Sequence, residues 1–245
     1  MLNRGSLRLA AALTIGATLA FEPNDAHAIA YGPSPLTVNL APGIVAQRHP
    51  RSCGYWQVYG AGCVGWTVTG LAVPPDLLDR ASLFTAARNG RIVVAHASGV
   101  AFTDDHGAHW NAARWEGANG PLSVAFDAAS DFGVAVGPNG GVWTTEDRGT
   151  TWRSRRDTAG QTLVDVVVIG RTLAFTDDHG GVWVSTDGGT SVRTLSDSAA
   201  NANGQMPRMT VHDRAIWVLV GGSVWWRADA SANVERVDHP PPAHD

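Results

Sequence analysis

Four aspartates recur along the chain at nearly constant intervals, and this regularity constrains the fold more than any other feature. Successive members are 42, 40 and 42 residues apart. The four are Asp105, Asp147, Asp187 and Asp229. Self-similarity at such a period is typical of repeat proteins, in which each repeat is one supersecondary unit. We therefore expect four structurally equivalent units.

Each unit has the pattern of β-strands. Short runs rich in β-branched and aromatic residues alternate with glycines and turn residues. In the first unit, Asn89 and Gly90 predict a hairpin turn, because both residues tolerate positive φ. Four strands in each unit, repeated radially, are the signature of a β-propeller blade. The sequence thus predicts an all-β fold, a small β-propeller of four-stranded antiparallel blades.

The segment upstream of the repeats sets the expected number of blades. It contains two alternating stretches rich in strand formers, so we expect a divergent first blade and five blades in all. The expected blade boundaries are 33–75, 76–118, 119–159, 160–200 and 201–238, followed by a disordered tail at 239–245. Residues 36–40 are a candidate strand to complete the last blade, since a propeller ring closes. One short helix is expected at 74–84 (PPDLLDRASLF).

The segment TEDRGTTW at 145–152 shows what the repeated aspartate does. It lies at the expected turn between the third and fourth strands, where a short carboxylate such as Asp147 can accept backbone N–H groups two residues on. Gly149 supplies a left-handed backbone conformation, and Thr145 and Thr151 flank the turn. Trp152 then covers the base of the hairpin with a large apolar face. Every residue type here has a structural role.

This segment resembles the Asp-box, or BNR repeat, with the pattern Ser/Thr-x-Asp-x-Gly-x-Thr-Trp. Such repeats occur in sialidases, sortilin-type receptor domains and photosystem II assembly factors, where they form structural clips remote from the binding face. The positions that match the pattern in three units are Thr103, Asp105, Gly107, Trp110, Thr145, Asp147, Gly149, Thr151, Trp152, Ser185, Asp187 and Gly189. In the fourth unit only Asp229 remains. The resemblance implies a propeller whose repeated aspartates are structural.

The first residues resemble an export signal. Arg4 and Arg8 precede the apolar run LAAALTIGATLAF, and the small residues AHA follow at 26–28. This order is typical of a cleavable signal peptide, so we expect residues 1–28 to be removed after Ala28. The mature chain is then periplasmic or secreted. No later segment has the ~20 apolar residues that a membrane crossing requires, so no transmembrane segment is expected in it.

Charge and cysteine usage narrow the partners. The net charge is −4, and the eighteen basic residues, all arginine, form no clustered stripe, which argues against nucleic acid. In an oxidising compartment Cys53 and Cys63 favour a disulfide, with two buried free thiols as the alternative. The divergent first blade is the best candidate for ligand binding, with aromatic residues near the loop that the two cysteines bound, although these residues could instead fill a blade core. The candidate ligand-binding residues are Tyr55, Trp56, Tyr59 and Trp66.

Two copies of TDDHG, at 103–107 and 176–180, raise the question of a metal site. Carboxylates and imidazoles are competent ligands. The copies fall in different turns of their units, however, so we expect ordinary turn chemistry and no metal. No Gly-rich phosphate loop followed by a helix is present, and no cofactor is expected.

The resemblance to sialidases raises glycoside hydrolysis. Such sites use an arginine cluster, a Tyr/Glu pair and an acidic catalyst, and begin with an Arg-Ile-Pro-like motif. The nearest segment here is RHP at 48–50, a poor match, so no catalytic residue is assigned. We expect an exported, non-catalytic propeller that acts as a binding or assembly scaffold for a protein or glycan partner. A divergent sialidase-like hydrolase, a lectin-like sugar binder, and assistance in assembling a membrane-bound complex remain open.

Overall fold

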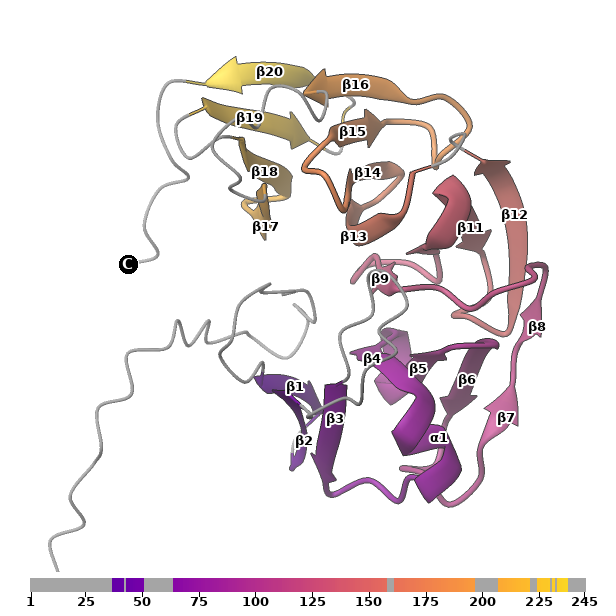
Figure 1. Ribbon diagram of the computed structural model, residues 1–245. Helices are drawn as coiled ribbons and strands as arrows, with labels where there is room; N and C mark the ends of the chain where they lie inside the picture. The colour runs from indigo at the N-terminus through magenta and orange to yellow at the C-terminus, as the bar shows by residue number, and fades with distance from the viewer. Residues whose placement is uncertain are drawn as a thin grey trace, which may run out of the picture.

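The computed structural model describes residues 37–41, 43–50, 64–157, 161–196, 207–220, 224–229, 231 and 233–237. These residues form β-strands almost throughout, with one α-helix, α1 (Pro75–Arg80). The strands make five sheets, which follow one another along an arc in Figure 1. The prediction of an all-β propeller with antiparallel, four-stranded blades is confirmed.

Each sheet is a meander of strands that are consecutive in the sequence. The first contains β1 (Thr37–Ala41), β2 (Ile44–Pro50) and β3 (Val64–Thr69). The second contains β4 (Ala81–Ala86), β5 (Ile92–His96), β6 (Gly99–Thr103) and β7 (Asn111–Ala112). The third contains β9 (Ser123–Phe126), β10 (Gly133–Val136), β11 (Gly141–Thr145) and β12 (Thr151–Asp157).

The last two sheets follow the same plan. The fourth contains β13 (Leu163–Ile169), β14 (Thr172–Asp177), β15 (Val182–Ser185) and β16 (Arg193–Ser196). The fifth contains β17 (Arg208–His212), β18 (Ala215–Val220), β19 (Val224–Asp229) and β20 (Val234–Val237). All pairings within these five meanders are antiparallel.

A further two-residue strand, β8 (Arg114–Trp115), crosses from the second sheet to the third. It pairs in parallel with β12, so that Thr151 faces Arg114 and Trp152 faces Trp115. This strand lies near the end of the expected unit 76–118 and adds a fifth strand to the outer edge of the next sheet.

The first and last sheets are each built from their own consecutive strands. β1 pairs with β2 in the first sheet, and the last sheet has four strands of its own, β17 to β20. The expectation that residues 36–40 complete the last blade is therefore wrong. The predicted signal peptide at 1–28 and the predicted tail at 239–245 lie outside the described residues.

The helix is shorter than the sequence suggested. It ends at Arg80, whose guanidinium pairs with Asp76 one turn earlier at 3.0 Å, and Ala81 already belongs to β4. Residues 81–84 were expected to be helical, but Leu83 and Phe84 are buried and pair with β5. Tertiary packing thus overrides a local helical preference.

The hairpin turn predicted in the second sheet is present. Asn89 has φ 61° and Gly90 has φ 75°, the left-handed conformation that the turn requires. Asn139 adopts a similar φ of 57° at a different turn, the one that joins β10 to β11 in the third sheet. Local sequence therefore determines these corners.

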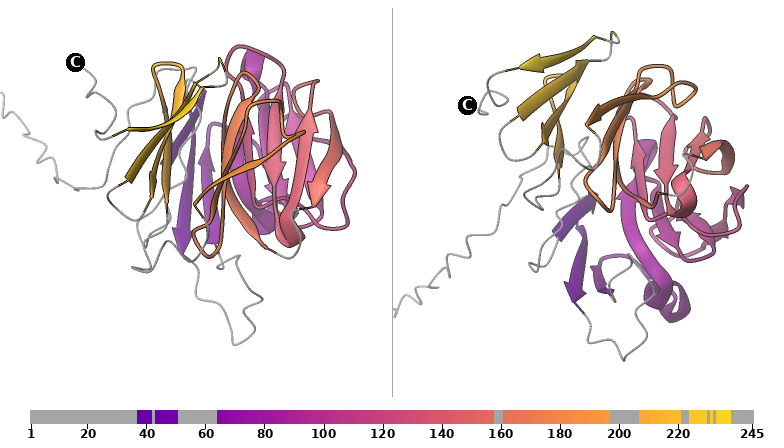
Figure 2. Two further views of the ribbon diagram at one scale, coloured as in Figure 1. Left: turned by 90° about the horizontal axis from the view of Figure 1, so that it is seen from above. Right: turned by 45° about the horizontal axis from the view of Figure 1, so that its top comes forward.

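Apolar side chains fill the spaces between neighbouring sheets. The first strands of successive sheets, β1, β4, β9, β13 and β17, pack against one another in that order. Figure 2 shows the sheets standing side by side. Between the second and third sheets lie Val93, Val124, Phe126 and Trp152, all nearly inaccessible to solvent. Within the described residues, no helix is long and apolar enough to cross a membrane.

Candidate functional site

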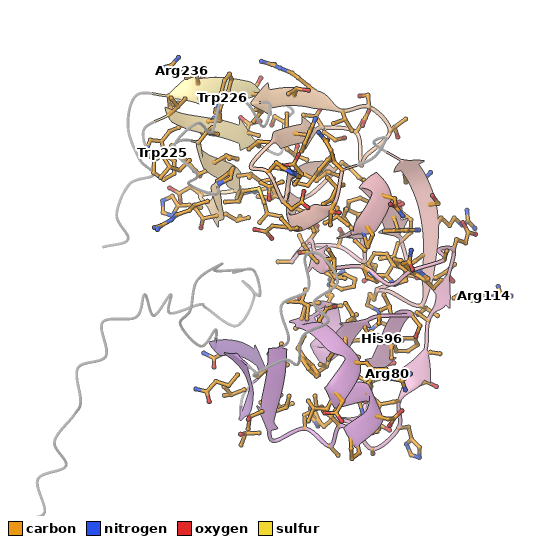
Figure 3. The ribbon with its side chains drawn as sticks, in the orientation of Figure 1. Arg80, His96, Arg114, Trp225, Trp226 and Arg236 are labelled. Carbon is orange, nitrogen blue, oxygen red and sulfur yellow. The ribbon has the colours of Figure 1, made fainter. Side chains whose placement is uncertain are left out.

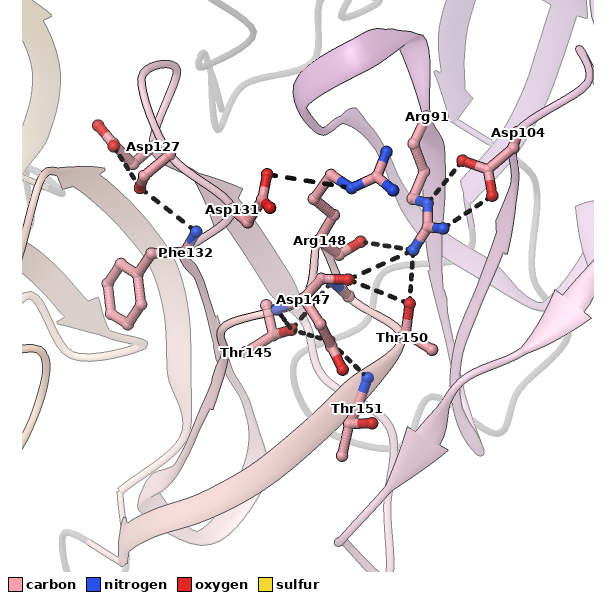
Figure 4. Close-up of polar contacts among 12 residues, drawn as sticks. Arg91, Asp104, Asp127, Asp131, Phe132, Thr145, Asp147, Arg148, Thr150 and Thr151 are labelled. Carbon is pink, nitrogen blue, oxygen red and sulfur yellow. Dashed lines mark hydrogen bonds and ion pairs between the residues drawn. The ribbon is translucent and has the colours of Figure 1, made fainter.

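The Asp-box turn of the third sheet is closed by two side chains acting together. The Thr145 hydroxyl donates to Asp147 Oδ1 at 2.7 Å and accepts the N–H groups of Asp147 and Gly149 at 3.3 and 2.9 Å. Asp147 Oδ1 accepts the N–H of Thr151 at 2.8 Å (Figure 4). Gly149 has φ 85°, which a residue with a Cβ adopts only under strain. The carboxylate was expected to capture N–H groups two residues on, whereas it captures the one four residues on.

The same arrangement recurs in every repeat. The aspartate accepts the N–H of the residue four positions later at 2.9 Å in the second sheet, 2.9 Å in the fourth and 3.1 Å in the fifth. These donors are His109, Ser191 and Asn233. The hydroxyl two positions before the aspartate caps the glycine N–H at 2.9 Å in the second and fourth sheets. The sequence-assigned residues of these turns therefore lie in separate, equivalent corners.

The last sheet keeps the aspartate but replaces the hydroxyl. Arg227 stands at the Ser/Thr position, and its guanidinium lies 3.3 Å from Asp229 Oδ2 and 3.1 Å from Glu235 Oε1. Asp229 Oδ1 also accepts the N–H of Ser231 at 2.9 Å. An ion pair and an extra turn bond thus replace the hydroxyl cap.

Hydrogen bonding lowers the pKa of each turn aspartate. The backbone and side chain of His109, together with Thr103, lower the pKa of Asp105 to about 2. For Asp147, burial acts to raise the pKa, but the Thr151 N–H and the Thr145 hydroxyl outweigh it and the pKa is lowered. Carboxylates that accept several N–H groups are stabilised in their charged form. These acids are therefore ionised parts of their turns.

The tryptophan that ends the Asp-box pattern anchors the third turn in the core. Trp152 is 0% exposed, and its indole N–H donates to the Gly149 carbonyl at 3.0 Å. Its ring meets Phe126 edge-on with centroids 5.8 Å apart and lies 6.0 Å from Trp115. In the second sheet, Trp110 is less buried and donates to the Ala72 carbonyl at 2.7 Å, which ties its turn to the segment between β3 and α1.

A buried arginine of the second sheet braces the third-sheet turn. Arg91 is 6% exposed and lies over the Phe102 ring at 4.0 Å. Its guanidinium makes a bidentate contact with Asp104 at 2.8 and 2.7 Å. The remaining nitrogen donates to Thr150 Oγ1 at 2.7 Å and to the Arg148 carbonyl at 3.2 Å (Figure 4). One side chain therefore joins two sheets, and its hydrogen bond lowers the pKa of Asp104.

The fourth sheet braces the same turn from the other side. Arg171 makes a bidentate contact with Glu146, whose oxygens lie 2.5 and 2.8 Å from its nitrogens. The Arg171 guanidinium lies 4.3 Å from the centre of the Phe132 ring. The Asp127 carboxylate of the third sheet accepts the Gly170 N–H at 2.9 Å. The best match to the Asp-box pattern is thus the turn that both neighbouring sheets hold.

Sequence reasoning missed these bracing arginines. Arg91, Arg171 and Arg214 each directly precede the second strand of a unit, so an arginine recurs at one repeat position. That recurrence is the signal that could have found them. The third sheet, whose turn receives the arginines of its neighbours, has Phe132 at this repeat position.

The two TDDHG copies lie in different turns, as expected. The first forms the Asp-box turn after β6, and the second connects β14 to β15. Ligand atoms of Asp177, Asp178 and His179 lie within 4.8 Å of one another. Asp177 Oδ1 accepts the N–H groups of His179 and Gly181 at 2.9 and 2.7 Å, however, and His179 Nδ1 lies 2.7 Å from Asp178. We assign this grouping to turn chemistry.

The candidate ligand-binding loop and the predicted disulfide lie outside what the structure describes. This applies to Cys53, Cys63, Tyr55, Trp56 and Tyr59, while Trp66 contributes its backbone to β3. The pairing of the cysteines and the role of these aromatics stay predictions.

Three tryptophans share one repeat position. Trp143 is 6% exposed and belongs to the core between the second and third sheets. Trp183 is half-buried, stacks on Phe175 and packs against the core between the third and fourth sheets. Trp225 is also half-buried, but it lies on the face of the last sheet opposite to the one that packs on the fourth. The repeated tryptophan thus faces the preceding sheet in the third and fourth sheets and the other side in the last.

Comparisons with known proteins agree with this fold. No family model matches the chain, and no curated protein matches it in sequence. Solved structures do match: "YCF48 bound to D1 peptide" at 16% identity and TM-score 0.45, covering 82% of this chain and 62% of that one; and "YCF48 from Cyanidioschyzon merolae" at 15% identity and TM-score 0.45, covering 82% and 68%.

A third match is a chain of the "Crystal structure of Nidogen/Laminin Complex", with 12% identity and TM-score 0.50, covering 77% of this chain and 72% of that one. The chain thus spans between three fifths and three quarters of the length of these three structures. At such identities the likeness concerns the fold alone. The chain has the fold of a β-propeller.

Proposed function

We propose that this protein is an exported, non-catalytic propeller that binds a protein partner through the outer face of its last sheet. The observation that carries the proposal is Trp225, a half-buried aromatic side chain on that face. Its ring meets Trp217 edge-on with centroids 6.5 Å apart. Successive residues of a strand point to opposite faces, so the adjacent Trp226 packs inward against the fourth sheet. Figure 3 shows both tryptophans on the last sheet.

The surroundings of Trp225 suit a protein partner. Leu219 and Val237 are its cross-strand neighbours on β18 and β20, which makes the centre of this face apolar. Arg227 and Glu235 form an ion pair beside it. An apolar centre with an aromatic anchor and a charged rim is the usual anatomy of a protein interface.

The braced turns support the same proposal. Arg91 and Arg171 join the second, third and fourth sheets through side-chain contacts, so these sheets form a pre-organised body. A pre-organised surface loses less conformational entropy when it binds. The repeated aspartates contribute to this rigidity and not to chemistry.

Capture of a partner by the mature protein tests the proposal. Immobilised wild-type protein should retain a protein from an extract of the exported compartment in stoichiometric amount, and Trp225→Ala should lose it. Arg236→Ala is the matched control. Arg236 is exposed on the same sheet, but it is the cross-strand neighbour of the inward-facing Trp226 and so lies on the face opposite to Trp225. Equal capture by wild type and Trp225→Ala would contradict the proposed surface. Release of a fluorogenic sugar by the protein would favour the glycosidase alternative instead.

Export itself is part of the proposal and has its own test. The charged, apolar and small-residue order of residues 1–28 supports it. N-terminal sequencing of the protein recovered outside the cytoplasm should begin at Ile29. Recovery of the intact chain from the cytoplasm alone would contradict it.

A further inference from the structure

Asp165 is a buried acid of the fourth sheet that belongs neither to the Asp-box turns nor to the contacts of the bracing arginines. It lies on β13, the first strand of the fourth sheet, where a bulge between Leu163 and Asp165 shifts the register with β14. The residue is 7% exposed. β13 packs against β9 of the third sheet, so Asp165 lies close to the interface between two sheets.

The carboxyl of Asp165 is incompletely satisfied. Within the described residues, Asp165 Oδ1 has no hydrogen-bond partner, and neither does the hydroxyl of Ser123 on β9, which is fully buried. The Ser123 hydroxyl is near enough to favour the charged carboxylate, as does the Val166 N–H. Its geometry nevertheless falls short of a hydrogen bond. Burying a carboxylate with so few donors costs far more free energy than burying the neutral acid.

The elements packed against β13 offer no charge that would compensate. β9, β10, β18 and the turn at Pro138–Gly140 contain no ionisable side chain. Asp177 lies at the end of β14, and Arg208 and His212 lie on β17. None of these three charges contributes to the titration of Asp165. Burial therefore dominates and raises the pKa of Asp165 to about 8.

We propose that Asp165 is a pH-sensitive lock on the interface between the third and fourth sheets. As the neutral acid it is accommodated between β9 and β13, and loss of its proton loosens that contact. The ordinary carboxyl titrates near 3.8, so between that pH and about 8 the unfolded chain binds fewer protons than the folded one. The stability that neutral Asp165 confers is therefore fully present below about pH 4 and falls as the pH rises toward about 8.

Equilibrium unfolding by denaturant between pH 5 and 9 tests this, with wild type and Asp165→Asn compared at each pH. The ratio of the wild-type unfolding constant to that of the variant should rise about tenfold per pH unit up to about pH 7 and level off above about pH 8. Other titrating groups cancel in the ratio. A ratio that stays constant across this range overturns the proposal.

Two further measurements keep the test decisive. Asp127→Asn is the matched control, since Asp127 is also buried but both of its oxygens accept hydrogen bonds; it should destabilise the protein without the rising ratio. Should Asp165→Asn fail to fold, isotope-edited infrared spectra of wild-type protein with labelled aspartate should show one neutral carboxyl at pH 7 that ionises near pH 8. Absence of that band at pH 7 overturns the proposal.

Discussion

The Asp-box turn of the third sheet and the corresponding turn of the last sheet hold their aspartates in the same way but differ in their surroundings. Asp147 and Asp229 each accept the N–H of the residue four positions later. The third-sheet turn also receives Arg91 from one neighbouring sheet and Arg171 from the other. The last one pairs with Arg227 of its own sheet and receives one hydroxyl from the fourth sheet, which Thr172 donates to the Asp229 carbonyl at 2.8 Å. The aspartate thus fixes the shape of the corner, and the position along the arc decides what the corner supports.

The two turns also differ in the residue that closes the pattern. In the third sheet a tryptophan closes the turn and fills the core, whereas Val234, half-buried, stands at that position in the last sheet. The fourth sheet has Val192 there, although it packs between two other sheets. The fully buried tryptophan therefore accompanies the turn that receives arginines from both neighbouring sheets.

The largest difference in stability is expected at the last position of the turn, which is Trp152 in the third sheet and Val234 in the last. Trp152→Ala should lower the free energy of unfolding by about 3 to 5 kcal/mol, because it empties a fully buried site beside Phe126. Val234→Ala should lower it by about 1 kcal/mol, since two methyl groups in a half-buried site are lost. Denaturant unfolding of both variants measures the contrast, and equal losses would refute it.

The second-largest difference in stability is expected between variants of the two bracing arginines, Arg91 and Arg171. Arg91→Met should cost about 1 to 2 kcal/mol, because it removes the hydrogen bonds that the buried Arg91 makes to Asp104 and to the Thr150 hydroxyl. Arg171→Met should cost under about 1 kcal/mol, since the side chains of Arg171 and Glu146 are 54% and 52% exposed. Thermal and denaturant unfolding would show this ordering. The reverse order would mean that the exposed Arg171–Glu146 contact contributes more to the sheet interface than the buried Arg91 does.

The aspartates should differ less. Asp147→Ala should lower the free energy of unfolding by about 1 to 3 kcal/mol, because it strands the Thr151 N–H and the Thr145 hydroxyl. Asp147→Asn, which keeps an acceptor, should cost less. Asp229→Ala should cost less than Asp147→Ala, since its turn receives one hydroxyl from a neighbouring sheet, that of Thr172, rather than two arginines. A greater loss at Asp229, or a lost binding activity at Asp147 with unchanged stability, would contradict this.

The smallest effect is expected in acid. The turn aspartates have lowered pKa values, so the stability that they confer is present above their ordinary value of 3.8 and is lost as the pH falls through the folded values. For Asp105 that loss extends down to about pH 2. Asp105→Asn should therefore flatten the decline of the melting temperature between pH 4 and pH 2. An unchanged decline would show that other carboxyls cause it.

Local features of the fold could be predicted from the sequence. The aspartate turn spans eight residues, Thr145 to Trp152, so its geometry depends on neighbours in the chain and recurs wherever the pattern recurs. The spacing of the aspartates then predicts the meanders. Which side chain accepts which N–H group could not be predicted from the sequence. A hydroxyl and a carboxylate compete for the same N–H groups, and the backbone conformation decides between them.

Features that depend on how sheets stack could not be predicted. Arg91 meets Thr150, 59 residues later, only because two sheets lie side by side. Residues 81–84 follow a good helical sequence, yet pairing with β5 makes them a strand. Trp225 has the same repeat position as Trp143, which faces the preceding sheet, but on β19 it is the adjacent Trp226 that faces the preceding sheet.

The short strand β8 has a mechanical consequence. By pairing in parallel with β12, it ties the second and third sheets at their outer rim, while β4 and β9 join them near the axis. Pulling these two sheets apart would shear backbone bonds at the rim as well as separate an apolar contact. Under mechanical load, the interface between the second and third sheets should therefore separate last. Separation should begin at interfaces where the connecting segment does not pair with the next sheet.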